Sequence, residues 1–307
     1  MIRTGYLRTS ARVSIRWRRW PCAPGRRRGW AVILPGRFEF IEKFGETASE
    51  LNDRGFDAFC LDWRGQGLSS RLLADRQRGY VDDYADYVSD LAAVLNRVVA
   101  PTGGGLRLLL THSMGGHIAL RYLHRYPAAA DRLILVSPMV DVNTAPYPRW
   151  LARSLARVAV ANGYAHAYVP GAGPYDLRRE RFSDNRLTAD FERFALSKRE
   201  VVRNPALALG GVTYGWLAAT FRSVDRLTAP GYTDPIRIPV LMATAGADRV
   251  VSLPAQLSLC ERLADCRRVI IPGALHEILM ETDPVRRAFW SAVDRFIDGE
   301  AAGRGTA

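Results

Sequence analysis

The chain has 307 residues, of which 48% are hydrophobic, which excludes a disordered protein and favours one large α/β domain with room for an insertion. No apolar run reaches the roughly 20 residues of a membrane-spanning helix. The formal net charge is +12, with 43 Lys and Arg against 31 Asp and Glu. Such a basic chain attracts anionic partners, either nucleic acid or anionic lipid.

The positive charge is concentrated at the amino end. Residues 1–30 contain nine arginines and no acidic residue, a composition that a transit peptide would share. The segments YLRTS and VSIRWRRW alternate like strands, however, and this favours a structural role. The chain shows no nucleic-acid motif, so we expect no nucleic-acid partner. Peripheral contact with an anionic membrane through this Arg-rich region is one interpretation, and an ordinary solvated face is the other.

From residue 29 onward, strand and helix signals alternate. The runs 29–36, 55–67, 106–113, 131–138, 238–248 and 266–273 are apolar on both faces, as buried parallel strands are. Helical patterns lie between them at 42–55, 84–99 and 116–127. This alternation predicts a mostly parallel, doubly wound sheet, in which ligands bind at the carboxyl ends of the strands.

The segment LLLTHSMGGHIALRY, residues 108–122, passes from a strand to a helix at Ser113. It is close to the G-x-S-x-G nucleophile elbow, with Thr111 in place of the first glycine. Gly115 and Gly116 would let strand and helix pack closely around a strained serine. Ser113 is therefore the candidate nucleophile, and a serine in an ordinary turn is the alternative.

Residues 140–235 interrupt the alternation. They contain three amphipathic helical patterns at 147–165, 188–204 and 213–227. We expect a helical cap, or lid, that covers the strand ends and excludes water, although a bundle without a role in binding would give the same pattern. The α/β core would then consist of residues 1–139 and 236–298, followed by a disordered tail at 299–307.

A serine nucleophile needs a base, an acid that orients the base, and oxyanion donors. Of the five histidines, only His276 follows the last strand, which is where the order Ser, acid, His places the base. Asp248 ends the preceding strand and is the favoured acid, while Asp141 is the alternative. The expected oxyanion donors are two backbone N–H groups. One belongs to Met114, and the other to Arg37 or its neighbour Phe38.

The cysteines show neither a C-x-x-C pair nor the spacing of metal ligands, so we expect no metal site. Free thiols in a reducing compartment, and hence a cytoplasmic protein, are the corresponding expectation. The four residues are Cys22, Cys60, Cys260 and Cys266.

Together, the motifs LPGRFEFIEKFGE, LDWRGQGLSSR, THSMGGH, GADRVV and GALHEI resemble the α/β-hydrolase superfamily. Within it they are similar to the lysophospholipase L2 and monoacylglycerol lipase group, which are serine aminopeptidase S33-type hydrolases. The insertion also resembles the cap of the bacterial lysophospholipases, and the resemblance covers about residues 5–298. The departures are Thr111 and the Arg-rich amino end.

The resemblance implies hydrolysis of a fatty-acyl ester in a lysophospholipid or a monoglyceride, without a cofactor. It assigns Ser113 as nucleophile, Asp248 as acid and His276 as base. Two other functions stay open on the same scaffold. One is an acyltransferase or small-substrate peptidase that uses the same triad, and the other is a non-catalytic ligand-binding protein.

Overall fold

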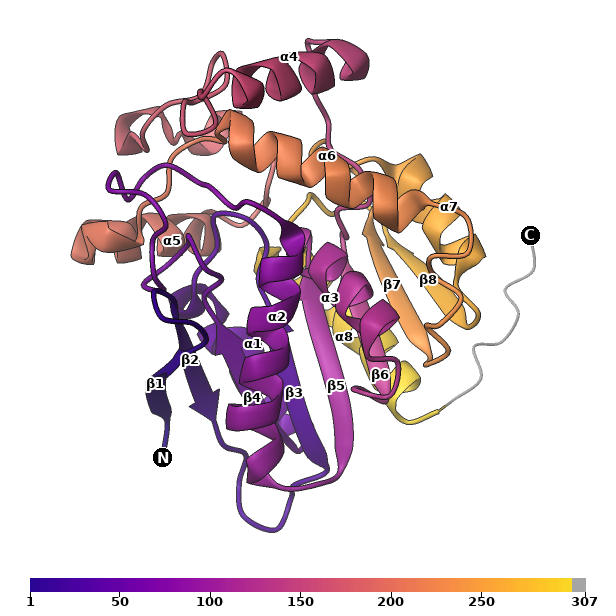
Figure 1. Cartoon of the computed structure of the whole chain (residues 1–307). Coiled ribbons are helices and arrows are strands. Elements are labelled where there is room, and N and C mark those ends of the chain that lie inside the picture. The colour runs from indigo at the N-terminus through magenta and orange to yellow at the C-terminus, as the bar shows by residue number, and fades with distance from the viewer. Residues whose placement is uncertain (300–307) are drawn as a thin grey trace.

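The computed structural model describes residues 1–299 and contains one eight-stranded sheet flanked by helices (Figure 1). The strands lie in the order β1-β2-β4-β3-β5-β6-β7-β8. The predicted tail, apart from Gly299, lies outside the described residues. The strand bounds are β1 Arg3–Arg8, β2 Ser14–Trp20, β3 Gly29–Leu34, β4 Phe56–Leu61, β5 Leu106–His112, β6 Arg132–Val136, β7 Val240–Ala245 and β8 Cys266–Ile271.

The Arg-rich amino end forms an antiparallel hairpin, β1–β2, as its alternation predicts, and β2 pairs antiparallel with β4. All other pairings are parallel. Leu34 at the end of β3 is opposite Thr111, and His112 at the end of β5 is opposite Val136 of β6. The carboxyl ends of three strands therefore meet beside Ser113.

Helices cover both faces of the sheet because alternate strand residues point to opposite sides. On β3, Val32 and Leu34 pack in one hydrophobic cluster, while Ala31 and Ile33 pack in the other. The first cluster includes α2 (Tyr84–Val94), α3 (Met114–Arg125) and α7 (Leu253–Arg262). The second includes α1 (Gly45–Asp53) and α8 (Asp283–Ile297). The predicted doubly wound sheet is confirmed.

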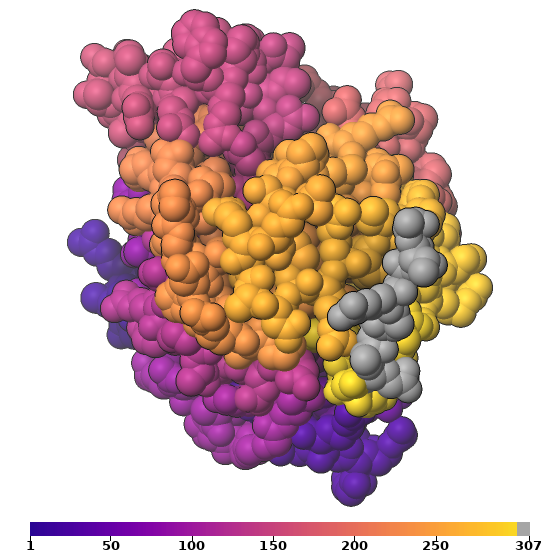
Figure 2. Space-filling model, turned by 90° about the vertical axis from the view of Figure 1, so that its right-hand side faces the viewer, coloured from indigo at the N-terminus to yellow at the C-terminus, as the bar shows by residue number. Residues whose placement is uncertain are grey.

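Between β6 and β7 the chain forms the helices α4 (Arg149–Ala161), α5 (Phe191–Arg203) and α6 (Tyr214–Thr228). Helix α6 contacts α2 and α3, and α4 packs on α6 (Figure 1). In Figure 2 the pink to magenta part of the cap rises above the orange to yellow segments, which comprise α6 of the cap and the carboxyl-terminal part of the core. The helical cap insertion is thus present, while the exact boundaries 140–235 stay a prediction.

Shorter helical turns connect these elements. A π-helical turn, Leu95–Val99, follows α2, and 3-10 turns precede α1 and follow the loop that carries His276. The 3-10 turns are Ile41–Phe44, Ala100–Thr102, Leu177–Arg179, Phe182–Asp184, Pro205–Leu207 and Ile278–Met280.

Two expectations about local structure are wrong. Strand β8 is not buried on both faces, because it is the last strand of the sheet and Ile270 is 50% exposed. Helix α3 begins at Met114, two residues before the predicted pattern at 116–127, because it starts directly after the serine turn.

The expectation of four free thiols is also wrong. The end of α7 and the start of β8 bring Cys260 and Cys266 to a Cα–Cα distance of 5.4 Å, and the two residues form a disulfide. Cys22 and the buried Cys60 are free. Disulfides persist mainly in oxidising compartments, so this pair weighs against the inference of a reducing compartment.

Candidate active site

A cavity of about 430 Å³ lies at the carboxyl ends of the strands, between the core and the cap. Core loops contribute Ser113 and His276 to its wall, and the cap contributes Phe194 and Trp216. The structure thus brings together residues that are distant in sequence, at the edge of the sheet that the strand pattern predicts. The lining also includes Arg37, Phe38, Glu39, Lys43, His112, Met114, Asp141, Leu187, Lys198, Val212, Leu217 and Glu277.

Ser113 occupies the sharp turn between β5 and α3. Its backbone has φ 48° and ψ −114°, a left-handed conformation that is strained for a residue with a Cβ. The turn is held in place because the Ser113 N–H donates to Val136 O at 3.0 Å and its carbonyl accepts from Met139 N at 3.0 Å. This is the geometry of a nucleophile elbow.

The two glycines after the serine permit close packing, as predicted. A Cβ on Gly115 would lie 2.0 Å from Leu34 O, which no side chain could tolerate. A Cβ on Gly116 would lie 3.1 Å from Thr111 Oγ1. Thr111 is fully buried, and its hydroxyl donates to Ile134 O of β6 at 3.0 Å. The threonine therefore bonds to the sheet and does not line the cavity.

Asp248 and His276 form the buried pair that the sequence predicts. His276 Nδ1 lies 2.8 Å from Asp248 Oδ2, and the Asp248 side chain is 0% exposed. The other carboxylate oxygen accepts from Val250 N at 2.7 Å and Val251 N at 3.2 Å. Burial alone would raise the pKa of Asp248, but His276 and the two amides outweigh it and lower that pKa. Within residues 1–299, the Nε2 of His276 makes no hydrogen bond.

The alternative acid, Asp141, also lines the cavity but is engaged elsewhere. It pairs with Arg149 of the cap helix α4, and it accepts from its neighbour Val142 N at 2.7 Å. The structure therefore brings Asp248, and not Asp141, to His276.

The candidate oxyanion donors lie on both sides of Ser113. Met114 is the first residue of α3, so its N–H lacks a helical acceptor. Phe38, whose φ is 74°, donates its N–H to Gln66 Oε1 at 2.8 Å. Among residues 1–299, the Arg37 N–H has no hydrogen-bond acceptor. Of the two candidates in this loop, Arg37 is thus the one whose amide is unoccupied.

The side chain of Arg37 ties this loop to the cap. Its Nη2 donates to Gly210 O at 2.7 Å, and its guanidinium carbon lies 5.2 Å from the ring centroid of Trp216. Burial lowers the pKa of this guanidinium to about 10. The loop that would bind the oxyanion is therefore joined to α6.

The rings of three other histidines contact residues other than the proposed catalytic residues, which is typical of a structural role. His117 is buried between Met139 O at 3.0 Å and Ser223 Oγ at 2.6 Å, and burial lowers its pKa to about 3. The ring of His124 stacks on Tyr232, and that of His166 meets Tyr80 edge-on.

Sequence reasoning missed a group of buried charged residues in the wall of the cavity. Glu39, Lys43 and Glu277 form a chain of ion pairs, and His112 joins it through Glu39. The one available signal was the occurrence of charged residues within apolar stretches next to the predicted site. Their mutual contact depends on the tertiary fold.

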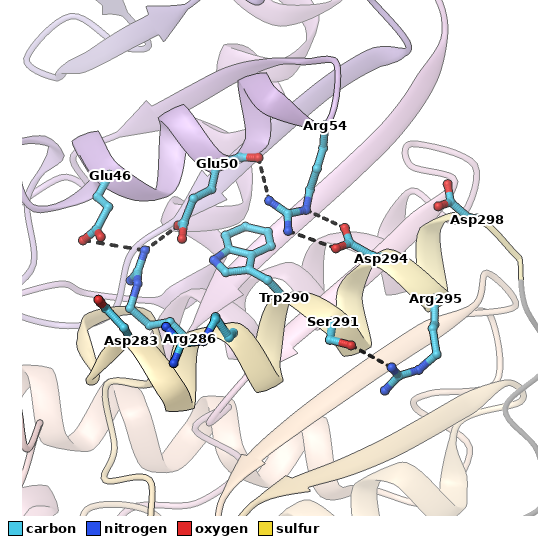
Figure 3. Close-up of a pocket in the computed structure, with 11 residues that line it drawn as sticks. Glu46, Glu50, Arg54, Asp283, Arg286, Trp290, Ser291, Asp294, Arg295 and Asp298 are labelled. Carbon is cyan, nitrogen blue, oxygen red and sulfur yellow. Dashed lines mark hydrogen bonds and ion pairs between the residues drawn. The ribbon is translucent and has the colours of Figure 1, made fainter.

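A second and larger cavity, of about 670 Å³, lies between α1 and α8 (Figure 3). Its charged side chains mostly pair with one another. Arg54 bonds to Asp294 and lies 4.2 Å from the Trp290 ring centroid, while Arg286 pairs with Glu50. The residues that line it include none of the predicted site residues, so this cavity is not the candidate active site.

The mostly parallel sheet with its helical cap, the turn at Ser113 and the His276–Asp248 pair at the same edge define an α/β-hydrolase. The family model described as Serine aminopeptidase, S33 matches residues 25–283, and the chain belongs to this family.

Curated relatives and solved structures agree with this class. Lysophospholipase L2 of Escherichia coli (strain K12) is 34% identical over 275 residues, covering 87% of this chain and 79% of its own length. The probable lysophospholipase L2 of Haemophilus influenzae is 31% identical, covering 87% and 83%. A monoglyceride lipase structure from Saccharomyces cerevisiae has a TM-score of 0.75 at 19% identity, covering 98% and 97%, and shows the same fold.

These matches confirm the predicted family and fold, and they place the chain among carboxylic ester hydrolases of the lysophospholipase and monoacylglycerol lipase kind. The individual roles of Ser113, Asp248, His276, Arg37 and Met114 stay predictions. Among residues 1–299, no group of three His, Cys, Asp or Glu side chains is arranged to hold a metal ion.

Proposed function

We propose that this chain hydrolyses the fatty-acyl ester of a lysophospholipid or a monoacylglycerol through an acyl-enzyme on Ser113. One observation carries the proposal: Ser113 lies on a strained elbow and lines the same cavity as His276, whose Nδ1 is held by the buried Asp248. A complete set of nucleophile, base and acid supports an enzyme over a ligand-binding protein.

In this mechanism His276 Nε2 takes the proton of the Ser113 hydroxyl as its oxygen attacks the ester carbonyl. Asp248 holds the imidazole in the tautomer with hydrogen on Nδ1 and stabilises the imidazolium. The Arg37 and Met114 N–H groups would stabilise the oxyanion. His276 then protonates the leaving alcohol, and water activated by the same histidine releases the fatty acid and restores the Ser113 hydroxyl.

The lining of the cavity supports a lipid substrate. The apolar side chains of Leu187, Phe194, Val212, Trp216 and Leu217 offer a surface for an acyl chain.

A polar group at the same wall suits a phosphate. Lys198 lies with its Nζ 3.9 Å from the Phe194 ring centroid and 3.2 Å from Glu180 Oε2. An ammonium group so placed could bind the phosphate of a lysophospholipid. We therefore favour the lysophospholipid, and the relatives at 31–34% identity bear that name.

Product analysis with lysophospholipids, monoacylglycerols and p-nitrophenyl esters tests the proposal. We expect free fatty acid from at least one lipid, with none from the Ser113→Ala variant. A parallel reaction with an added acceptor alcohol separates a hydrolase from an acyltransferase, because a transferase would form a new ester in place of free acid. Release of fatty acid at the wild-type rate by Ser113→Ala would refute the proposed mechanism.

Contact with an anionic membrane through the Arg-rich amino end stays a prediction, and the structure reduces the charge available for it. Five of its arginines pair with acidic residues: Arg16, Arg18, Arg19, Arg27 and Arg28. Within residues 1–299, no helix is both long and apolar enough to cross a bilayer. The cytoplasmic location also stays a prediction.

A further inference from the structure

Four buried titratable side chains lie beside the proposed catalytic residues in the wall of the same cavity. They are Glu39, Lys43, His112 and Glu277, and each is at most 9% exposed. Glu39 follows β3 in the oxyanion loop, His112 precedes Ser113, and Glu277 follows His276. One cluster therefore touches all three segments that would carry the reaction.

The contacts within the cluster form a continuous chain. Lys43 Nζ lies 2.9 Å from Glu39 Oε1 and 2.9 Å from Glu277 Oε1. His112 Nδ1 lies 2.8 Å from Glu39 Oε2, and His112 Nε2 lies 3.2 Å from the carbonyl oxygen of His276. His112 thus links the oxyanion loop to the backbone of the loop that carries the base.

The partners of His112 determine its protonation. A backbone carbonyl can only accept, so the Nε2 that faces the His276 oxygen carries a hydrogen. The Glu39 Oε2 that faces Nδ1 also accepts the N–H of Gly36, as an ionised carboxylate does. A hydrogen on Nδ1 as well would satisfy this contact and would make His112 an imidazolium.

Charge balance gives the same answer. Glu39 and Glu277 bring two negative charges, and Lys43 brings one positive charge. Because an unbalanced charge is costly in the protein interior, a protonated His112 completes a neutral cluster. We propose that His112 stays protonated in the working enzyme and acts as a positioning residue that fixes the oxyanion loop and the His276 loop relative to Ser113. This inference rests on the proposed hydrolase function.

The electrostatic surroundings agree with the hydrogen bonds. Burial would lower the pKa of His112 and Lys43 also lowers it, but Glu39 and Glu277 outweigh both and raise it. Burial would raise the pKa of Glu39, but His112 and Lys43 lower it below the usual range. The ring of His276 also lies against His112, at a centroid distance of 4.8 Å.

Nitrogen NMR of protein labelled at histidine tests the protonation directly. The signals that vanish in His112→Gln belong to His112, and we expect both of its ring nitrogens to be protonated at pH 8. His117 is the matched control, because it is equally buried but burial lowers its pKa to about 3, so one of its nitrogens should be bare. A bare ring nitrogen on His112 at pH 8 would overturn the inference.

Kinetics test the positioning role. His112→Gln leaves a net negative cluster, and we expect kcat to fall about tenfold or more with KM within about twofold, since small displacements of catalytic groups are costly. Adding Glu277→Gln restores neutrality and should recover most of the lost kcat. A purely steric role would give no recovery and would refute the inference, as would an unchanged kcat in the single variant. His117→Gln should leave kcat within about twofold.

The pH dependence of unfolding adds a measurement that needs no substrate. The pKa of His112 is raised in the folded state, so its stabilising contribution is full below the unfolded pKa of about 6.5 and is lost as pH rises through the folded value. The stability difference between wild type and His112→Gln should therefore shrink at alkaline pH, and a difference that grows there would contradict the inference. Absence of lipid hydrolysis in the wild type would refute the proposed function, while the NMR result would still decide the protonation.

Discussion

The core loops below the cavity and the cap helices above it hold their side chains in different ways. Below, Ser113 is fixed by backbone hydrogen bonds and His276 by a fully buried carboxylate. Above, α4 leaves large apolar side chains exposed, with Trp150 at 69% and Val158 at 59%. The core residues are held by hydrogen bonds, whereas the cap exposes apolar side chains. We therefore expect the chemical step to depend on the core, and the choice and delivery of substrate to depend on the cap.

The strongest test of this division is removal of the nucleophile. Ser113→Ala should lower kcat by roughly 10⁴- to 10⁶-fold, because no acyl-enzyme forms. Circular dichroism should show an intact fold, since the side chain makes no hydrogen bond recorded among residues 1–299. A fluorophosphonate probe should label wild type at Ser113 alone, and labelling at another residue would exclude this serine as the nucleophile.

The second largest loss of activity is expected when the candidate acid, Asp248, is replaced. Asp248→Asn should lower kcat by about 10²- to 10⁴-fold, because the amide favours the wrong tautomer of His276. Asp141→Asn, on the cap side of the cavity, is the matched control. Its kcat should stay within about threefold of the wild-type value, because the Asp141 carboxylate pairs with Arg149. The opposite ranking would assign the acid to Asp141.

The lowered pKa of Asp248 predicts that the free energy of unfolding depends on pH. The pKa of Asp248 is lowered in the folded state, so its contribution is full above the unfolded value of about 3.9 and is lost as pH falls through the folded value. Denaturant unfolding of wild type and Asp248→Asn should therefore converge in strong acid. A difference independent of pH would show that the carboxylate is not held as described.

The cap should affect substrate choice and not the chemical step. Lys198→Met should lower kcat/KM for a lysophospholipid by about 10- to 100-fold, the cost of a lost charge-assisted hydrogen bond, and leave a monoacylglycerol nearly unaffected. Lys198→Arg keeps the charge and should retain most of the activity. Equal losses on both lipids would refute a role in binding phosphate.

The exposed face of α4 offers a weaker test of how substrate arrives. Replacing Trp150 and Val158 with serine should lower binding to vesicles of anionic phospholipid by about fivefold, roughly 1 kcal/mol of apolar burial. Ile270→Ser, on the exposed edge strand, is the control for a general loss of surface apolarity. If instead Arg3→Gln with Arg12→Gln abolishes binding, the amino-terminal hairpin is the contact surface.

These tests also separate what the sequence could predict from what it could not. The strand–turn–helix at Ser113 and the strand end at Asp248 are local patterns, so their positions could be derived. The cluster of Glu39 and His112 joins segments far apart in the chain, so no local sequence pattern could predict their contact. The disulfide joins cysteines only six residues apart, but it depends on how the end of α7 lies against the edge strand β8, which the spacing alone does not show. The exposure of β8 likewise depends on its place at the edge of the sheet.

Thr111 should give the smallest effect on activity, although it is the residue that departs from the elbow motif. Its hydroxyl bonds to Ile134 O and faces Gly116 rather than the cavity. Thr111→Val should therefore keep kcat/KM within about twofold and lower the free energy of unfolding by about 1 kcal/mol, because it leaves a buried carbonyl short of one donor.

Thr111→Gly restores the residue usual in the motif and should also remain active. Its stability should fall by a further 0.5–1 kcal/mol or so, since glycine in a strand interior loses more backbone entropy on folding. Kinetics with thermal melts on both variants separate the two contributions. A loss of about tenfold in kcat/KM for the valine variant with a normal melt would mean that the Thr111 hydroxyl contributes to the reaction. Thr111, the penultimate residue of β5, would then belong to the catalytic site and not only to the sheet.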